Sequence, residues 1–309
     1  MNLFKPRFWD RNKISFLSIL LFPFAILFEL LNFVKRSSIT PQKCPVPVIC
    51  VGNIYLGGTG KTPLSVEIFH ILKNLNKNPA FVRKKYDAFQ DESKLQKKIG
   101  SVYESKKRIE AIKEAAQNNI DVVILDDGFQ DYSIKKDLSL VCFSEKQWIG
   151  NGLLIPSGPL RERLSALKRA NCVMINGPKN TNIEDEILKK NKNIKIFYTI
   201  HKAENVMKFR DRKIIAFAGI GNPNNFFDLL RDNNINLSEK ISFPDHYPYS
   251  QKVLQNLQDK SSKQNATLLT TEKDFFRINK NFRNNIDYLK IIVELENKEK
   301  FIEEIKKII

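Results

Sequence analysis

The segment Gly52–Thr62, with the sequence GNIYLGGTGKT, constrains the fold more than any other stretch of this chain. It follows the apolar run Val46–Val51, which is typical of a buried strand, and it precedes a helical pattern over Thr62–Leu75. Glycines let backbone amides approach an anion, and the first turn of a helix attracts phosphate. In such a phosphate loop Lys61 contacts the β- and γ-phosphates, and the Thr62 hydroxyl contacts Mg²⁺. The sequence therefore predicts a nucleotide as ligand.

The glycine spacing differs from the general phosphate-loop pattern. Gly-x4-Gly-Lys-Thr requires a glycine at the position of Tyr55, whereas this chain has glycines at positions 57, 58 and 60. The alternative interpretation is a Gly-rich turn before a helix. The order of strand, loop and helix favours nucleotide binding, for which we expect these residues: Asn53, Gly57, Gly58, Thr59, Gly60, Lys61 and Thr62.

Apolar runs alternate with amphipathic helical patterns along most of the chain. After the phosphate loop, strands are predicted at 79–82, 121–125, 138–143, 171–175 and 194–200, with a helix at 106–116. This order predicts an α/β fold in which helices cover both faces of a mostly parallel sheet. A second alternation contains strands at 214–218, 267–269 and 288–293 and helices at 225–231, 250–264 and from 298. Since 309 residues exceed one ordinary core, we expect three parts: an N-terminal helix (1–36), a phosphate-loop domain (37–205) and a smaller C-terminal α/β lobe (206–309).

The N-terminal part contains an apolar run, Ile14–Val34, with basic residues on both sides. The run is long enough to cross a bilayer, but Pro23 interrupts it and Glu29 would be costly at depth. At helical spacing a narrow polar stripe leaves a broad apolar face; the stripe consists of Ser15, Ser18, Glu29 and Asn32. This pattern favours a helix lying in a membrane surface, and the alternatives are a membrane span or a buried helix. The run lacks a small-residue cleavage site, so a removed signal peptide is not expected.

Charge and cysteine content limit the partners and the compartment. With 51 Lys and Arg against 34 Asp and Glu, the formal charge of +17 predicts attraction to nucleic acid, an anionic membrane or phosphorylated substrates. Charge alone does not choose among these. The cysteines are far apart and form no Cys-x-x-Cys pair, so we expect buried reduced thiols in a cytosolic protein: Cys44, Cys50, Cys142 and Cys172.

Two further segments carry acidic residues that suit a nucleotide site. Asp126 and Asp127 end the predicted strand at 121–125, where a carboxylate would face the nucleotide crevice and hold Mg²⁺, although Asp-Asp-Gly is also a common turn. The segment 150–162 combines glycines and prolines with a pair of opposite charges, Arg161 and Glu162. It predicts a stiff loop in which Glu162 makes a second Mg²⁺ contact, with a structural turn as the alternative.

The histidines have different surroundings in the sequence. His70 falls on the apolar face of the helix after the phosphate loop, where we expect it to pack. His246 lies in a proline-bounded loop, Phe243–Pro248, in which a titratable group can stay solvated and functional. The segment Thr271–Asp274 follows a strand and could contact a ligand, but a helix cap is the default interpretation.

Taken in order, these segments resemble the tetraacyldisaccharide 4′-kinase family of lipid A biosynthesis. The matches extend from Pro45 to Asp274 and comprise Val-Gly-Asn-Ile with Gly-Gly-Thr-Gly-Lys-Thr-Pro, Asp-Asp-Gly-Phe-Gln, Gly-Asn-Gly with Pro-x-Gly-Pro-Leu-Arg-Glu, Gly-Ile-Gly-Asn-Pro, Phe-Pro-Asp-His and Thr-Glu-Lys-Asp. Each motif is modest, but the set is specific. The family's phosphate loop resembles this glycine spacing, and its members carry an N-terminal hydrophobic helix.

The resemblance implies transfer of the γ-phosphoryl group of ATP to the 4′-hydroxyl of an acylated glucosamine disaccharide phosphate at a membrane. It implies ATP and Mg²⁺ as cofactors, an anionic lipid surface as partner, no nucleic acid, a monomer, and a location at the cytoplasmic face of the inner membrane. The implied catalytic residues are Asp91, His246, Lys61 and Asp127, and the implied metal contacts are Thr62, Asp126, Asp127 and Glu162. Asp91 would accept the hydroxyl proton, and His246 would orient or share it.

The chain departs from the family pattern on the acceptor side. The family's Gly-Asp-Glu-Pro is Gln-Asp-Glu-Ser at 90–93, its Ser-Arg-Gly-Tyr-Gly is represented by Arg83–Asp87, and its histidine after Phe-Gln is Asp131. Two other interpretations therefore stay open. One is a soluble, basic phosphate-loop NTPase that acts on nucleic acid, and the other is a non-catalytic homologue that binds nucleotide or lipid.

Overall fold

The computed structural model describes residues 6–10, 13–85 and 91–309. These residues fold into two compact units. The larger unit holds residues 6–10, 13–85, 99–200 and 293–309, and the smaller unit holds residues 91–98 and 201–292. The domain limits expected from the sequence stay a prediction.

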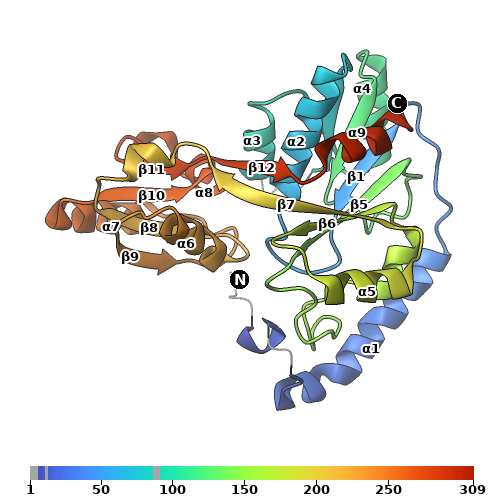
Figure 1. Cartoon of the computed structure of the whole chain (residues 1–309), viewed down its shortest axis with the longest axis horizontal. Coiled ribbons are helices and arrows are strands. Elements are labelled where there is room, and N and C mark those ends of the chain that lie inside the picture. Colours follow the sequence, from blue (N-terminus) through green and yellow to red (C-terminus); the bar gives the residue numbers. More distant parts are fainter. Residues whose placement is uncertain (1–5, 11–12, 86–90) are drawn as a thin grey trace. The chain divides into compact units, whose positions relative to one another are not determined.

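The larger unit is built on an eight-stranded sheet with the order β12-β7-β6-β5-β1-β4-β2-β3 (Figure 1). The strands are β1 (Val48–Gly52), β2 (Pro79–Lys84), β3 (Val102–Ser105), β4 (Val122–Asp126), β5 (Leu138–Ser144), β6 (Cys172–Asn176), β7 (Lys195–Ala203) and β12 (Ile291–Leu295). Every pair from β7 to β3 is parallel. In the register of β1 and β4, Val51 lies opposite Asp126, so the loops after these two strands leave the sheet side by side.

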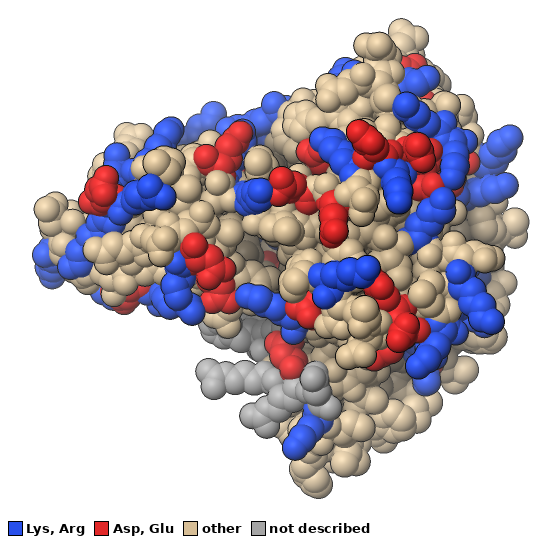
Figure 2. Space-filling model, in the orientation of Figure 1, with Lys and Arg blue, Asp and Glu red and all other residues tan. Residues whose placement is uncertain are grey.

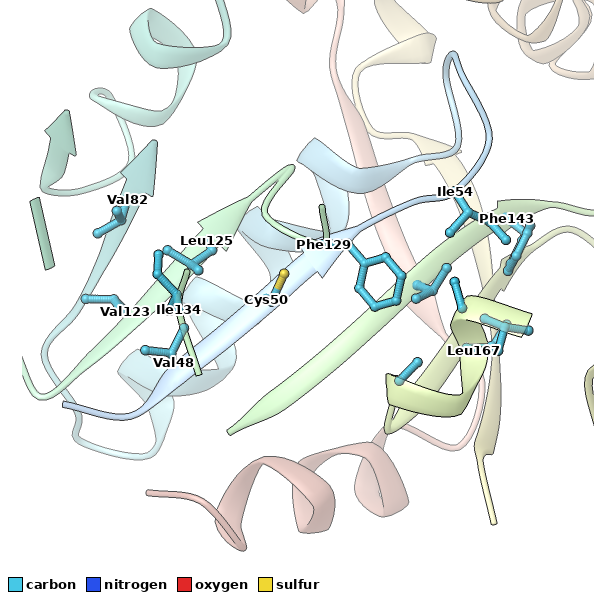
Figure 3. Packing of buried hydrophobic residues seen from close by; sticks show 14 of the residues in the cluster. Val48, Cys50, Ile54, Val82, Val123, Leu125, Phe129, Ile134, Phe143 and Leu167 are labelled. Carbon is cyan, nitrogen blue, oxygen red and sulfur yellow. The ribbon is translucent and has the colours of Figure 1, made fainter. Parts of the chain in front are cut away.

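Helices cover both faces of this sheet because alternate strand residues point to opposite sides. On one face, α2 (Lys61–Asn74) and α9 (Lys298–Lys306) pack with Ile49 and Val51 in a single core. On the other face, α4 (Arg108–Gln117), α5 (Thr181–Lys190) and the short helix η2 (Leu164–Arg169) pack with Val48 and Cys50. Figure 3 shows this second core, in which Phe129 from the turn after β4 lies among residues of the neighbouring strands.

The smaller unit contains a four-stranded parallel sheet with the order β11-β10-β8-β9. Its strands are β8 (Ile214–Ala218), β9 (Leu237–Ser242), β10 (Thr267–Thr271) and β11 (Ile286–Leu289). Helix α6 (Pro223–Asp232) packs on one face and α7 (Gln251–Gln264) on the other. Helix α3 (Asp91–Gln96) packs against α8 (Glu272–Arg277). The remaining short helices are η1 (Arg7–Asp10), η3 (Val206–Phe209) and η4 (Lys280–Phe282).

The predicted α/β class, with a mostly parallel main sheet between two layers of helices, is confirmed, and the structure adds that the smaller unit also has a parallel sheet. The predicted strand at 288–293 is wrong, because the chain forms two strands there: β11 ends at Leu289 in the small sheet, and β12 begins at Ile291 in the large one. Sequence order placed the last helix with the smaller lobe. In the structure Phe301 and Ile305 of α9 are fully buried in the core of the larger unit.

The N-terminal helix α1 (Phe16–Ser37) attaches to the larger unit by its polar and small residues. Ser18 and Ala25 are buried, and the Asn151 side-chain amide donates to the Ser18 hydroxyl at 3.1 Å. Arg163 donates two hydrogen bonds of 2.5 Å to the carboxylate of Glu29. Most of the apolar side chains on the rest of the helix are exposed. Within the described part of the chain, α1 is the helix that is long and apolar enough to cross a membrane.

Candidate active site

The loop between β1 and α2 has the geometry of an anion site. Gly60 adopts a left-handed conformation with φ of 85°, which an L side chain rarely tolerates, and so turns the chain directly into α2. The buried Asn53 amide holds the loop from inside by donating to the Gly57 carbonyl at 3.3 Å and to the Thr59 hydroxyl at 3.0 Å. The amides of the first turn of α2 then attract an anion.

The segment 150–162 braces the phosphate loop from its other side. The Leu56 amide donates to the Pro159 carbonyl at 2.8 Å, and the Arg161 amide donates to the Ile54 carbonyl at 2.7 Å. The Tyr55 side chain is fully buried between α1 and this segment and packs with Leu160. Tyr55 stands where the general motif has glycine, so here packing rather than backbone freedom fixes that position.

Asp127 faces the phosphate loop and meets two basic groups. One of its carboxylate oxygens lies 3.7 Å from the Lys61 ammonium. Arg161 donates to both oxygens, at 2.9 and 3.1 Å. Asp127 has a left-handed φ of 55°, and its carboxylate remains about one-third exposed. Two cations from other segments and the carboxylate of this turn therefore meet at the start of α2.

Asp126, the last residue of β4, has a different environment. Its side chain is 1% exposed and forms an ion pair of 2.8 Å with Arg83 at the end of β2. Pairing by a bidentate-capable guanidinium offsets the cost of burying the carboxylate. The neighbouring aspartates thus lie at different depths, with Asp126 inside the unit and Asp127 at its surface.

Arg161 and Glu162 do not pair with each other, so that part of the sequence interpretation is wrong. Both oxygens of Glu162 accept hydrogen bonds from Arg169, at 2.6 and 2.7 Å. Tyr132 donates to the same carboxylate at 2.5 Å, and Gln130 donates to it at 3.1 Å. Burial and the bond to Glu162 raise the pKa of Tyr132 to about 12. Glu162 would have to exchange one of these partners in order to contact a metal, and its metal role stays a prediction.

The donor set fits Mg²⁺ held jointly with nucleotide. Among the described residues, no three His, Cys, Asp or Glu side chains gather closely enough to hold a metal by themselves. Mg²⁺ usually takes only one or two carboxylates, together with phosphate oxygens and water. The Thr62 hydroxyl at the start of α2 and the carboxylates of Asp126 and Asp127 supply oxygen donors of the required kind.

Motif reasoning did not single out Arg108 and Arg169, which contact the candidate residues Asp127 and Glu162. Arg108 is nearly buried; it donates to the Asp127 carbonyl at 3.0 Å and to Asp131 at 3.1 Å. Arg169 stacks 4.1 Å above the Phe129 ring while it binds Glu162. Both lie outside the Gly-rich and acidic motifs, so the sequence contained no spacing signal for their roles.

The acceptor-side candidates lie in the smaller unit. His246 has a left-handed φ of 57°, and its Nε2 lies 3.4 Å from the Lys273 ammonium and 3.9 Å from Asp245. Asp91 is the first residue of α3, and its side chain lies outside the described residues. Helix α3, which begins at Asp91, packs against α8, which carries Lys273. The roles predicted for Asp91 and His246 stay predictions.

Other sequence expectations have clear outcomes. Cys50, Cys142 and Cys172 are buried, and burial raises the pKa of each thiol to about 12. Cys44 is half-buried, and all four are free thiols. The packing role expected for His70 is wrong, because the side chain is exposed on α2 while Phe69 fills the core beside it.

A family model described as tetraacyldisaccharide-1-P 4′-kinase matches residues 17–101 and 87–309 of this chain. The tetraacyldisaccharide 4′-kinase of Pelagibacter ubique (strain HTCC1062) is 40% identical over 300 residues, which are 96% of this chain and 95% of that protein. The corresponding kinase of Rickettsia akari (strain Hartford) is 32% identical over 324 residues, which cover 99% of this chain and 98% of the relative.

The fold is also similar to that of a solved structure. A crystal structure of LpxK from Aquifex aeolicus in complex with ATP aligns with a TM-score of 0.72 and 27% identity, covering 94% of this chain and 99% of that one. The nearly full-length matches agree with the phosphate loop, the paired aspartates and the apolar helix α1. On this combined evidence, the chain belongs to the tetraacyldisaccharide 4′-kinase family.

Proposed function

We propose that this chain transfers the γ-phosphoryl group of ATP to the 4′-hydroxyl of a tetraacyl glucosamine disaccharide 1-phosphate at a membrane surface. The observation that carries the proposal is the convergence of Lys61, Arg161 and Asp127 at the N-terminus of α2. A helix N-terminus with two cations suits the β- and γ-phosphates, and a partly exposed carboxylate beside them suits their metal.

The donor side divides into binding and charge stabilisation. The amides of the Asn53–Gly60 loop and of the first turn of α2 would hold the phosphates, and Lys61 would offset the charge that develops on the transferred group. Thr62, Asp126 and Asp127 would hold Mg²⁺, which neutralises phosphate charge when bound. Glu162 would fix Gln130 and Arg169 under the loop, and it is a further metal contact if it exchanges one partner.

The acceptor side would use the smaller unit. We propose that Asp91 accepts the proton of the sugar hydroxyl and that His246 orients or shares it, because phosphoryl transfer requires a positioned nucleophile more than a strong base. The left-handed backbone of His246 and its contact with Lys273 support a functional role for the ring. Such a conformation is costly for a residue other than glycine and is often found at functional sites.

The apolar face of α1 would place the site at the lipid. Ser18, Ala25 and Glu29 fasten the helix to the unit that carries the phosphate loop, which leaves the exposed apolar side chains for the membrane. We propose a monomer at the cytoplasmic face of the inner membrane, where ATP is available. Lysine and arginine side chains would add attraction to anionic lipid and to the substrate phosphate.

Transfer of labelled phosphate from ATP to purified tetraacyl disaccharide 1-phosphate in mixed micelles tests the proposal. Lys61→Ala should lower turnover about 100-fold or more, because it removes a cation from the transferred phosphoryl group. Lys73→Ala is the matched control, since Lys73 is exposed at the far end of the same helix. The proposal would be contradicted if the wild-type protein bound ATP but transferred no labelled phosphate to the lipid. Unchanged transfer by Lys61→Ala would also contradict it.

A further inference from the structure

Three motifs of the smaller unit end at one edge of its sheet. Gly219 follows β8, the Phe243–His246 segment follows β9, and Thr271 ends β10. Since β8 pairs in parallel with both β9 and β10, their carboxyl ends lie next to one another. Segments that are far apart in the sequence therefore meet at the loop that carries His246.

A buried carboxylate organises this edge. Asp274 is completely buried, and one oxygen accepts from the Gly219 amide at 3.0 Å and from the Thr271 hydroxyl at 2.7 Å. Its other oxygen accepts from Arg277 at 2.7 Å. The Thr271 hydroxyl also caps α8 by accepting from the Asp274 amide at 3.1 Å. The predicted helix cap is thus present, but it does not explain why the charge of Asp274 is buried beside Gly219.

The backbone N–H and C=O of Gly219, on either side of its Cα, connect this pair to His246. The Gly219 carbonyl accepts from Arg277 at 2.9 Å and from the His246 backbone amide at 3.1 Å. A Cβ on Gly219 would lie 2.9 Å from the Tyr249 hydroxyl and 3.2 Å from the Pro244 carbonyl, so a side chain there would push the His246 loop away. The bond that the His246 amide donates to the Gly219 carbonyl thereby helps to hold His246 in its left-handed conformation.

The ring of His246 is held at a second point. The Lys273 ammonium lies 3.4 Å from Nε2 and 3.8 Å from an Asp245 oxygen. An ammonium group only donates hydrogen bonds, so the contact is a hydrogen bond when Nε2 carries no proton, which favours the tautomer with the proton on Nδ1. Lys273 and Asp274 are neighbours on α8, which means that one short helix holds the backbone of His246 and favours one tautomer of its ring.

We infer that Asp274 and Arg277 are positioning residues for His246: Asp274 holds the backbone N–H of Gly219, and Arg277 holds the Gly219 carbonyl to which the His246 amide donates. The inference rests on the acceptor-side role proposed above for His246. On this inference, the Gly-Ile-Gly-Asn-Pro and Thr-Glu-Lys-Asp motifs share one role, which is to position His246. This role differs from phosphate binding, which we assign to the phosphate loop.

A double variant separates positioning from mere stability. Arg277→Gln alone leaves a buried carboxylate without its cation, so it should destabilise the chain, and Asp274→Asn in addition should restore much of the stability. Transfer should not recover in the double variant: kcat should stay about 10-fold or more below wild type, with the KM for ATP nearly unchanged, because the donor to the Gly219 carbonyl is still missing. Recovery of kcat together with stability would overturn the inference.

Arg283→Gln is the matched control. Arg283 also donates to backbone carbonyls of the smaller unit, but these are the carbonyls of Phe276 and Ile278, both at 2.9 Å, rather than that of Gly219. It should lower stability without a selective loss of kcat. An equal loss of kcat in Arg283→Gln and in the double variant would show that the effect is a general weakening of the unit and would reject the inference.

Ring-nitrogen NMR gives a readout that needs no lipid. The chain has three histidines, so single substitutions assign each signal. The wild-type His246 ring should show the Nδ1–H tautomer. The double variant should show a mixture of tautomers, because a displaced His246 loop moves Nε2 away from the Lys273 ammonium, whereas Arg283→Gln should match wild type. An unchanged His246 spectrum in the double variant would contradict the inference. If the NMR result holds while His246→Ala still transfers phosphate at the wild-type rate, the acceptor role of His246 fails and the positioning network stands.

Discussion

At the scale of single residues, Asp131 stands where the family pattern has a histidine, and its neighbours form hydrogen bonds that suit a carboxylate. The carboxylate accepts from Arg108 at 3.1 Å and from the Ser133 hydroxyl at 2.6 Å, while Lys136 donates to the Asp131 backbone carbonyl. Arg108 in turn binds the carbonyl of Asp127. Asp131 therefore stabilises the turn that carries Asp127.

Asp131→His should lower the free energy of unfolding by about 1–3 kcal/mol, because Arg108 would stay nearly buried without a carboxylate. Urea unfolding followed by circular dichroism measures this change. Asp228→Asn is the comparison, since Asp228 pairs with Arg231 at an exposed site and its loss should cost no more than about 0.5 kcal/mol. Similar losses in both variants would show that the Asp131–Arg108 ion pair contributes no more to the free energy of unfolding than an exposed pair does.

The same residue predicts an acid response. Burial alone would raise the pKa of the Asp131 carboxyl, but the Ser133 hydrogen bond and the Arg108 charge outweigh it and lower the pKa below 3.8. The native state then binds its proton less readily than the unfolded chain, so this stabilisation is complete above the unfolded pKa and is lost as the pH falls through the native pKa. The stability difference between wild type and Asp131→Asn should therefore shrink between about pH 5 and about pH 3. A constant difference across that range would contradict the assignment.

At the scale of elements, α1 has two faces with separate tasks. Its buried Ala25 packs with Tyr55 of the phosphate loop and with Leu154 and Leu160, whereas residues such as Phe24 and Leu31 are more than half exposed. The proposed contact with lipid and the bracing of the phosphate loop would thus be carried by different residues of one helix.

Substitutions on the two faces should affect different properties, vesicle binding on one face and ATP binding on the other. Replacing Phe24 and Leu31 with Ser should weaken binding to lipid vesicles by about 10-fold or more and leave ATP affinity unchanged. Ala25→Leu should instead preserve vesicle binding and weaken ATP binding, since overpacking beside Tyr55 costs about 1–3 kcal/mol. Vesicle sedimentation and binding of a fluorescent ATP analogue measure the two effects. A loss of both properties in both variants would mean that the faces are not independent.

At the scale of the whole molecule, the formal charge of +17 is not gathered in one cluster on the face shown in Figure 2. Lys and Arg side chains alternate there with Asp and Glu. Many basic residues are held in ion pairs, such as Lys195 with Glu304 and Lys260 with Glu239. The net excess still attracts an anionic surface, because long-range attraction depends on the summed charge.

Membrane binding should therefore respond to salt in two parts. Binding to vesicles that contain anionic lipid should weaken as salt rises, since each nearby Lys or Arg contributes about 1 kcal/mol that salt screens. Binding to neutral vesicles should be weaker at low salt and nearly independent of salt, because the apolar face of α1 alone supports it. Equal binding to both kinds of vesicle at low salt would exclude the electrostatic contribution.

Much of the fold and part of the site could be predicted from local patterns. The phosphate loop, the strand that ends at Asp126 and the alternation of strands with helices depend on residues that are close in sequence. Arg108 and Arg169 could not be predicted, because their partners lie on other elements and their own sequence surroundings are ordinary. The division of 288–293 between two sheets was missed for the same reason, because the sequence of a short apolar strand does not indicate which sheet the strand joins.

The sequence by itself indicated the kind of chemistry, since a Gly-rich loop that ends in Lys61 and Thr62 already predicts a bound phosphate. The tertiary structure alone decided which charges pair and which helix belongs to which core. Glu29 meets Arg163 across 134 positions, and α9 returns from the end of the chain to the larger sheet. The physical reason is that motifs and periodicity report on neighbours along the chain, whereas ion pairs and core packing depend on distances that folding creates.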